Sequence, residues 1–236
     1  MNDLEKYFSE HSGNLIHKWM HYFEIYDRHF SRYRGTDVHV VEIGVNQGGS
    51  LQMWKHYFGP RAVIYGVDIN PSCKALEEEQ VEILIGSQED RAFLRSVAGK
   101  IPRMDILIDD GGHMMEQQIN TFEELFGHVD SRGVYLCEDM HTSYWPRFGG
   151  GYRKSTSFVE YTKNFIDYLN AWHSEERARL DVSDFTRSAH SLHYYDSVLV
   201  IEKRPIEEPY HRQKGTPRLQ EYEPPPRPRP RFKLFG

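Results

Sequence analysis

Acidic and histidine side chains follow two apolar runs of the sequence, at the point where each run ends. Residues 109–113 (DDGGH) end the run MDILIDD, and residues 138–141 (EDMH) end the run GVYLCED. Neighbouring parallel strands lie about 4.8 Å apart, so Asp110, Glu138 and Asp139 converge on one point if the two runs form adjacent strands. Three carboxylates repel one another without a cation, and oxygen ligands suit a hard ion. We therefore predict a Mg²⁺ site at these three residues, with Mn²⁺ or Ca²⁺ as alternatives.

His113 stands three residues after Asp110, within reach of a substrate held at such an ion. Histidine titrates near neutrality, which suits a general base, so His113 is the predicted catalytic residue. The competing interpretation is that the acids are helix caps and turn formers, because Asp and Asp-Gly are common at strand ends.

A glycine turn follows an earlier apolar run in the segment EIGVNQGGS, which begins at Glu42. The G-x-G-x-x-G pattern of dinucleotide-binding proteins is absent, since Asn46 replaces its second glycine, and no Gly-Lys-Ser/Thr P-loop is present. Asp68 ends the next run, 68 − 44 = 24 positions after Gly44, where an acid suits ribose hydroxyls. Glu42 favours a cationic group over pyrophosphate. Together these features favour S-adenosylmethionine (SAM), the alternative being a Rossmann-like fold that uses its glycines only for tight turns.

The elements that position these residues are predicted from alternating apolar runs and longer amphipathic stretches. This alternation is typical of an α/β protein with a mostly parallel sheet. Aromatic residues at spacings of three and four predict a helix over residues 16–30. We also predict a late strand over residues 192–202 that closes the edge of the sheet, with an antiparallel orientation as one option. The other predicted strands are residues 38–44, 63–69, 81–87, 104–110 and 133–139.

Composition limits the class of protein and its organisation. The 236 residues carry a formal net charge of -6, which argues against nucleic-acid binding, and the sequence shows neither a membrane span nor a signal peptide. We expect a cytoplasmic protein with reduced cysteines. Eight of the 12 prolines fall in the last 32 residues, which predicts a domain over residues 1–204 and a proline- and arginine-rich tail over 205–236. We expect the tail to be disordered in isolation, with docking on a neighbouring subunit as the alternative, and the protein to be a homodimer.

The segments ILIDDGGH and YLCEDMHTSYWP resemble the metal-dependent sugar O-methyltransferases of macrolide biosynthesis and the related cephalosporin hydroxylase and rhamnosyl O-methyltransferase group. The resemblance extends over residues 15 to about 203. It implies a Rossmann-like class I methyltransferase fold, with a seven-stranded, mostly parallel sheet and helices on both faces. It also implies that Asp110, Glu138 and Asp139 hold Mg²⁺ and that His113 takes the proton. The implied SAM-binding residues are Glu42, Gly44, Ser50, Asp68, Ser87, Gln88 and Asp109, with His21 and Lys18 at the amino-acid end of the cofactor.

We therefore expect a SAM- and Mg²⁺-dependent O-methyltransferase that acts on a sugar hydroxyl of a glycoside, a polysaccharide such as a mannoside, or a natural-product deoxysugar. A Mg²⁺-dependent catechol O-methyltransferase and a non-catalytic SAM-binding regulator are the alternatives. The aromatic residues Tyr144 and Trp145, followed by Pro146, and the glycine-rich stretch 148–151 predict a lid over the acceptor.

Overall fold

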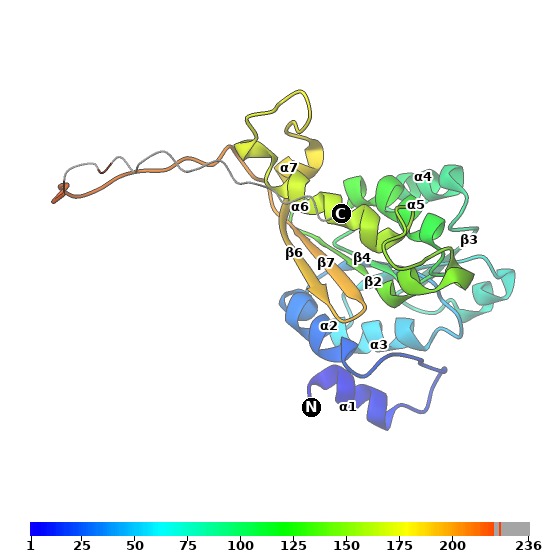
Figure 1. Ribbon diagram of the computed structural model, residues 1–236. Coiled ribbons are helices and arrows are strands. Elements are labelled where there is room, and N and C mark those ends of the chain that lie inside the picture. Colours follow the sequence, from blue (N-terminus) through cyan, green and yellow to red (C-terminus); the bar gives the residue numbers. More distant parts are fainter. Residues whose placement is uncertain (220–221, 223–236) are drawn as a thin grey trace.

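The computed structural model describes residues 1–219 and 222. Its strands are β1 (His39–Ile43), β2 (Val63–Asp68), β3 (Val81–Ile85), β4 (Ile106–Asp109), β5 (Val134–Cys137), β6 (Ala189–Tyr195) and β7 (Val198–Lys203). They form one seven-stranded sheet of order β3-β2-β1-β4-β5-β7-β6 (Figure 1). The first five strands are parallel, whereas β7 is antiparallel to both β5 and β6. The predicted α/β class and the mostly parallel sheet are confirmed.

Helices cover both faces of the sheet and divide the core into two layers. One layer packs the sheet against α1 (Asp3–Glu10), α2 (Tyr22–Phe30) and α3 (Gly49–Phe58). The other packs it against α4 (Arg91–Lys100), α5 (Met115–Leu125), α6 (Phe158–Leu169) and α7 (Asp184–Ser188). Alternate side chains of each strand enter opposite layers, as Val40 and Val41 of β1 do. This explains why the strands read as continuous apolar runs. Short 3₁₀ helices lie at Ser31–Tyr33, Pro71–Leu76, Phe126–His128, Met140–Tyr144, Pro146–Phe148 and Ala171–His173.

The helix predicted over residues 16–30 begins only at Tyr22, so its first six residues were wrongly assigned. Residues 14–18 are instead irregular and run against the start of α3. A Cβ added at Gly49 would lie 2.4 Å from the carbonyl oxygens of Asn14 and Leu15, so the two backbones are in close contact. Ile16 is therefore buried against α3, outside any helix. Its apolar character extended the apparent helical pattern beyond the real element.

The single late strand predicted over residues 192–202 is a hairpin of β6 and β7. The turn between them contains Asp196 and Ser197, and Ser197 adopts a left-handed conformation with φ 63°. A turn of this kind reverses the chain where a continuous strand was predicted. The other five predicted strands are confirmed, with ends shifted by one or two residues.

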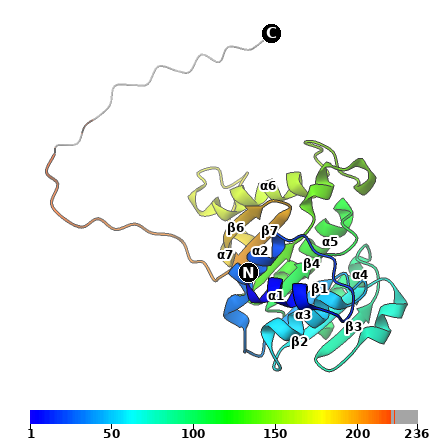
Figure 2. The same cartoon turned by 90° about the horizontal axis from the view of Figure 1, so that it is seen from below.

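Residues 207–219 lead away from the sheet as an extended segment (Figure 2). The proposed boundary at residue 204 remains a prediction, and most of the proline-rich part of the predicted tail lies outside the described residues. Within the described residues, no helix is long and apolar enough to cross a membrane. Cys73 and Cys137 are both buried and free.

Candidate active site

A cavity of about 450 Å³ opens at the carboxyl ends of the parallel strands. Its wall is formed by the segments that follow β1 to β5 and by residues 15–19, which come from the irregular stretch before α2. This is the edge of an open α/β sheet where ligands bind, and the volume lies within the usual range of about 300–1,000 Å³ for small-molecule sites.

Asp68 organises the glycine turn after β1. Its Oδ2 accepts hydrogen bonds from the backbone N–H groups of Val45 at 2.9 Å and Asn46 at 3.0 Å, and its Oδ1 accepts one from Asn70 at 2.8 Å. Gly44 adopts φ 99°, and a Cβ there would lie 2.0 Å from the carbonyl oxygen of Asp110. A glycine is thus required for the turn to approach the end of β4, which places Asp68 and Asp110 on the wall of one cavity.

Asp109 and Gln88 form a buried pair next to the cavity. Gln88 Nε2 donates to Asp109 Oδ1 at 2.7 Å and to Thr121 Oγ1 at 2.8 Å, while Gln88 Oε1 accepts from the Gly112 N–H at 3.1 Å. Burial raises the pKa of Asp109 to about 7, although the bond from Gln88 opposes the shift. Gln88 therefore connects the segment after β3 with the one after β4.

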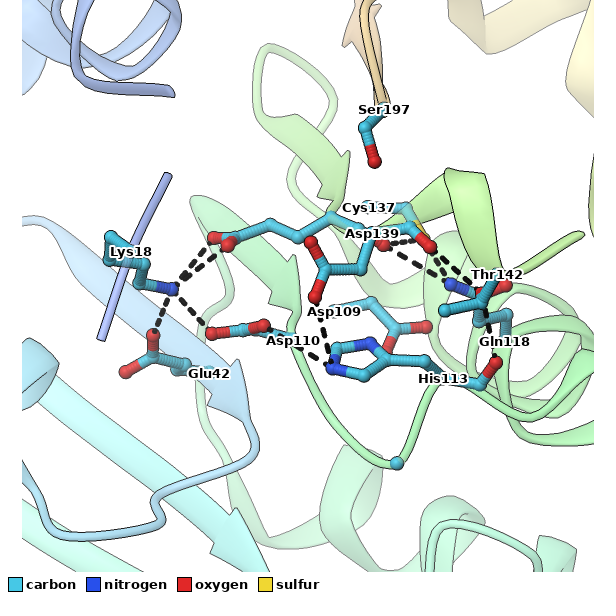
Figure 3. A network of polar contacts seen from close by, with 12 residues as sticks. Lys18, Glu42, Asp109, Asp110, His113, Gln118, Cys137, Asp139, Thr142 and Ser197 are labelled. Atoms are coloured by element: carbon cyan, nitrogen blue, oxygen red, sulfur yellow. Dashed lines mark hydrogen bonds and ion pairs between the residues drawn. The ribbon is translucent and has the colours of Figure 1, made fainter. Parts of the chain in front are cut away.

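Lys18 lies in the middle of three carboxylates (Figure 3). Its Nζ donates to both carboxylate oxygens of Glu138 at 2.9 and 3.0 Å, donates to Asp110, and lies 3.6 Å from Glu42 Oε1. The side chains of Lys18, Glu42 and Glu138 are at most 2% exposed. Burial alone would lower the pKa of Lys18, but the charges of Asp110, Glu138 and Glu42 outweigh it and raise this pKa well above its ordinary value. The lysine is therefore a buried ammonium ion that offsets the charge of the acids.

Two tyrosines of α2, four residues apart on one face of the helix, bind the acids that follow β5. The hydroxyl of Tyr26 donates to Glu138 Oε1 at 2.6 Å, and that of Tyr22 donates to Asp139 Oδ1 at 2.7 Å. Burial and the nearby Asp110 raise the pKa of Glu138 well above its ordinary value, an effect that Lys18 and Tyr26 oppose. Sequence reasoning missed both tyrosines. The available signal was that α2 carries hydroxyl-bearing aromatics at these two positions and phenylalanine elsewhere.

A second group of side-chain atoms, which could act as metal ligands, lies on the side of Asp110 away from Lys18. His113 Nε2 is 3.8 Å from Asp110 Oδ1 and 3.4 Å from Asp139 Oδ2, and ligand atoms of the three residues all lie within 4.8 Å of one another. His113 and Asp139 both have left-handed backbones, with φ 57° and 54°. Strained conformations of this kind persist where surrounding structure enforces them, and they cluster at functional sites. Asp110 and Asp139 thus offer two of the three predicted oxygen ligands beside His113, whereas the third, Glu138, faces Lys18.

The structure brings most of the predicted site residues together and leaves three away from the cavity wall. Glu42 lies behind the wall, where it accepts a hydrogen bond from Ser50 Oγ at 2.8 Å, and Asp109 lies behind Gln88. His21 lies outside, with its ring nitrogen 3.1 Å from the carbonyl oxygen of Asp196. The predicted site residues that line the cavity are Lys18, Gly44, Ser50, Asp68, Ser87, Gln88, Asp110, His113, Glu138 and Asp139.

A row of aromatic rings continues outward from the acids. His141 Nδ1 lies 3.9 Å from Asp139 Oδ1, and the His141 ring contacts Trp145 at 4.5 Å and Trp19 at 5.9 Å between centroids. Both indoles are exposed, Trp19 at 53% and Trp145 at 38%. Trp145 belongs to the segment predicted as a lid, and it lies between the short 3₁₀ helices Met140–Tyr144 and Pro146–Phe148.

Comparison with known proteins identifies the relatives of this chain. No family model matches it. It is 37% identical over 205 residues to demethylmacrocin O-methyltransferase of Streptomyces fradiae, covering 81% of this chain and 51% of that protein. It is 38% identical over 191 residues to 8-demethyl-8-alpha-L-rhamnosyl tetracenomycin-C 2'-O-methyltransferase of Streptomyces olivaceus, covering 78% of this chain and 50% of that protein. The chain is a homologue of these sugar O-methyltransferases.

A solved structure agrees with this homology. The MycE methyltransferase of the mycinamycin biosynthetic pathway, in complex with Mg and SAH, superposes with a TM-score of 0.76 at 35% identity, covering 86% of this chain and 55% of that one. The predicted Rossmann-like methyltransferase fold and the resemblance to sugar O-methyltransferases are thus confirmed. The chain spans about half the length of the curated relatives it matches.

Proposed function

We propose that this chain is a SAM- and Mg²⁺-dependent O-methyltransferase that transfers a methyl group to a sugar hydroxyl, as in a glycoside or a natural-product deoxysugar. The observation that carries the proposal is that one cavity combines the glycine turn and Asp68 with the acids and histidine at the ends of β4 and β5. The homologues are named for O-methylation of demethylmacrocin and of a rhamnosyl tetracenomycin-C.

The chain's residues fit both groups that this reaction needs. Asp68 lies at the cavity wall, where its carboxylate can accept hydrogen bonds from ribose hydroxyls. The glycine turn leaves space for the cofactor beside the backbone. Asp110, Glu138 and Asp139 would hold Mg²⁺ through oxygen ligands. SAM supplies an electrophilic methyl group when bound, and the metal ion polarises a hydroxyl and orients it.

His113 is the proposed general base. Its Nε2 faces Oδ1 of Asp110 and Oδ2 of Asp139, so the proton of the acceptor hydroxyl would pass to Nε2. The left-handed backbone of His113 holds its ring at this position.

The aromatic row of Trp19, His141 and Trp145 is the proposed acceptor side of the site. Exposed indole rings offer flat apolar faces on which a sugar ring can stack. The row begins next to Asp139, so a sugar stacked on it would lie near the proposed base.

Release of S-adenosylhomocysteine (SAH) tests the proposal. The protein is incubated with SAM and either p-nitrophenyl α-L-rhamnopyranoside, demethylmacrocin or catechol, each with Mg²⁺ and with EDTA. We expect turnover on a sugar substrate that EDTA abolishes and Mg²⁺ restores. Turnover on catechol alone would replace the sugar by a phenolic acceptor. Turnover indifferent to EDTA would remove the metal role, and SAM binding without any turnover would support a regulator.

We also propose that the protein is a cytoplasmic homodimer. Two buried free thiols support a reducing compartment. Tyr210 and Leu219, 78% and 88% exposed on the segment that leaves the domain, are apolar side chains that a contact between subunits would bury.

A further inference from the structure

Lys18 has two sets of partners within the acid cluster: it is hydrogen-bonded to one and forms only a longer ion pair with the other. Its Nζ is hydrogen-bonded to both oxygens of Glu138 and to Asp110. Oε1 of Glu42 lies 3.6 Å from Nζ, is buried, and makes no hydrogen bond of normal length and angle. The buried indole N–H of Trp54, which is also unpaired, is a second donor near this carboxylate. A buried carboxylate oxygen with no donor is costly, so this atom is an available acceptor next to a buried donor.

Glu42 is held so that this acceptor stays in place. Its other oxygen, Oε2, accepts from the Ser50 hydroxyl at 2.8 Å, and the side chain is fully buried at the end of β1. A shift of less than about 1 Å would bring Nζ of Lys18 within hydrogen-bond distance of Oε1.

The proposed function places a competing demand on Glu138. If Glu138 helps to hold a divalent cation, its oxygens cannot also bind the ammonium ion, because two cations at one carboxylate repel each other. Tyr26 already occupies one lone pair of Oε1, so little capacity remains. The Lys18 side chain is 2% exposed, and Glu42 is the carboxylate within 4 Å of its Nζ that is not among the proposed metal ligands.

We propose that Lys18 is a tethered cation with two positions: bonded to Glu138 and Asp110 when no divalent cation is bound, and bonded to Glu42 when one is. This inference rests on the metal site of the proposed function. It assigns Glu42 the task of receiving the lysine, in place of a direct contact with the cofactor. Lys18 and Glu42 thereby become positioning residues that set the affinity of the cluster for the metal ion.

Manganese binding to four proteins tests this exchange. The loss of the electron paramagnetic resonance signal of free Mn²⁺ gives the dissociation constant for the wild type, Lys18→Met, Glu42→Gln and the double variant. Lys18→Met should tighten binding at least 10-fold, because no ammonium ion competes. Glu42→Gln should weaken binding about 10-fold, because the lysine loses its second position. The double variant should have a dissociation constant within 2-fold of that of Lys18→Met alone, because Glu42→Gln has no lysine left to act on.

These four proteins form a double-mutant cycle, which distinguishes movement of Lys18 between two positions from a purely electrostatic effect of Glu42. If Glu42 attracts the ion only by its charge, Glu42→Gln weakens Mn²⁺ binding equally with and without Lys18, and this additive result overturns the proposal. Weaker binding by Lys18→Met would also overturn it. Lys18→Gln provides a second variant if Lys18→Met does not fold. Lys203→Met, which removes another buried lysine far from the cluster in the sheet, should leave the dissociation constant unchanged.

Failure of the inference is distinguishable from failure of the proposed function. An additive cycle combined with EDTA-sensitive methyl transfer removes the two-position lysine and leaves the enzyme's metal dependence intact. Absence of saturable Mn²⁺ binding to the wild type overturns both.

Discussion

The hydroxyl groups of Tyr22 and Tyr26 and the ammonium group of Lys18 hold the carboxylates of the site in place. Sequence reasoning located the acids themselves, because residue type and strand-end position are both visible in the sequence. The partners could not be located in this way. A tyrosine at a buried helix position has the same apolar pattern as a phenylalanine, and Lys18 reaches Asp110 across 92 residues of chain. Tertiary packing determines which side chains form hydrogen bonds with the carboxylates.

Removal of the Tyr26 hydroxyl should destabilise the protein measurably. Tyr26→Phe leaves Glu138 buried with one donor fewer, and loss of a hydrogen bond to a charged group costs about 1.5–3 kcal/mol. The free energy of unfolding in urea measures this loss. Tyr33→Phe is the matched control, because its hydroxyl bonds to the exposed carbonyl of Arg132 and its removal should cost little. Equal losses in the two variants would contradict the importance of the buried bond.

His113→Ala should lower turnover and leave the cofactor in place. General-base catalysis contributes about 10² to 10⁴-fold, so kcat should fall by that factor. The dissociation constant of SAH, measured by calorimetry, should stay within about 2-fold, because the adenosine side of the cavity is formed by other residues. His128→Ala, at an exposed position, serves as the control. Unchanged turnover in His113→Ala would exclude the imidazole as the base.

At the scale of elements, the sequence predicts the five parallel strands and fails where local pattern and tertiary structure differ. The strands are continuous apolar runs because both faces are covered. The start of α2 was placed too early because Ile16 is buried against α3 without being helical. The β6–β7 hairpin was read as one strand because only the two residues Asp196 and Ser197 interrupt its apolar pattern.

The hairpin is joined to α2 by a buried histidine, which makes its attachment dependent on pH. His29 Nδ1 contacts Glu202 Oε1 at 2.8 Å and Nε2 contacts the Tyr195 hydroxyl at 2.9 Å. Burial lowers the pKa of His29, although Glu202 opposes the shift. Below about pH 6.5 the unfolded chain takes up a proton at this residue more readily than the folded protein. The contribution of His29 to the free energy of unfolding is therefore fully present above that pH. It is lost as the pH falls toward the folded-state pKa.

His29→Gln should reduce this dependence. Urea unfolding at pH 7.5 and pH 5.5 should show a smaller difference in the free energy of unfolding for His29→Gln than for the wild type. Some difference will remain, because burial also lowers the pKa of His39 and raises that of Asp109 to about 7, which adds a dependence of opposite sign. The exposed His128→Gln should keep the wild-type difference. An unchanged difference in His29→Gln would place the pH dependence elsewhere.

At the scale of the whole molecule, the division into residues 1–204 and 205–236 is testable by truncation. The last backbone hydrogen bonds between this segment and the domain in the described residues are those of Arg204 N–H with Ser188 and Ile206 N–H with Arg187. A chain ending at Glu207 keeps both bonds, so its melting temperature should match that of the full chain. A large fall would show that later residues belong to the folded domain.

The same truncation tests the homodimer. If residues after Glu207 join two subunits, light scattering should give twice the chain mass for the full protein and the single mass for the truncated one. A dimer that survives truncation would place the interface on the domain, and a monomeric full chain would contradict the proposed assembly.

The strand order has a consequence for the biosynthesis of this protein. β5 pairs with β4 on one side, but its other edge is covered by β7, which begins 198 − 137 = 61 residues after β5 ends. At a synthesis rate of about 5–20 residues per second, the apolar edge of β5 stays unpaired for roughly 3 to 12 s. An unpaired strand edge is a template for association with other chains. The nascent protein therefore passes through an interval in which binding of β5 by a molecular chaperone would protect it from aggregation.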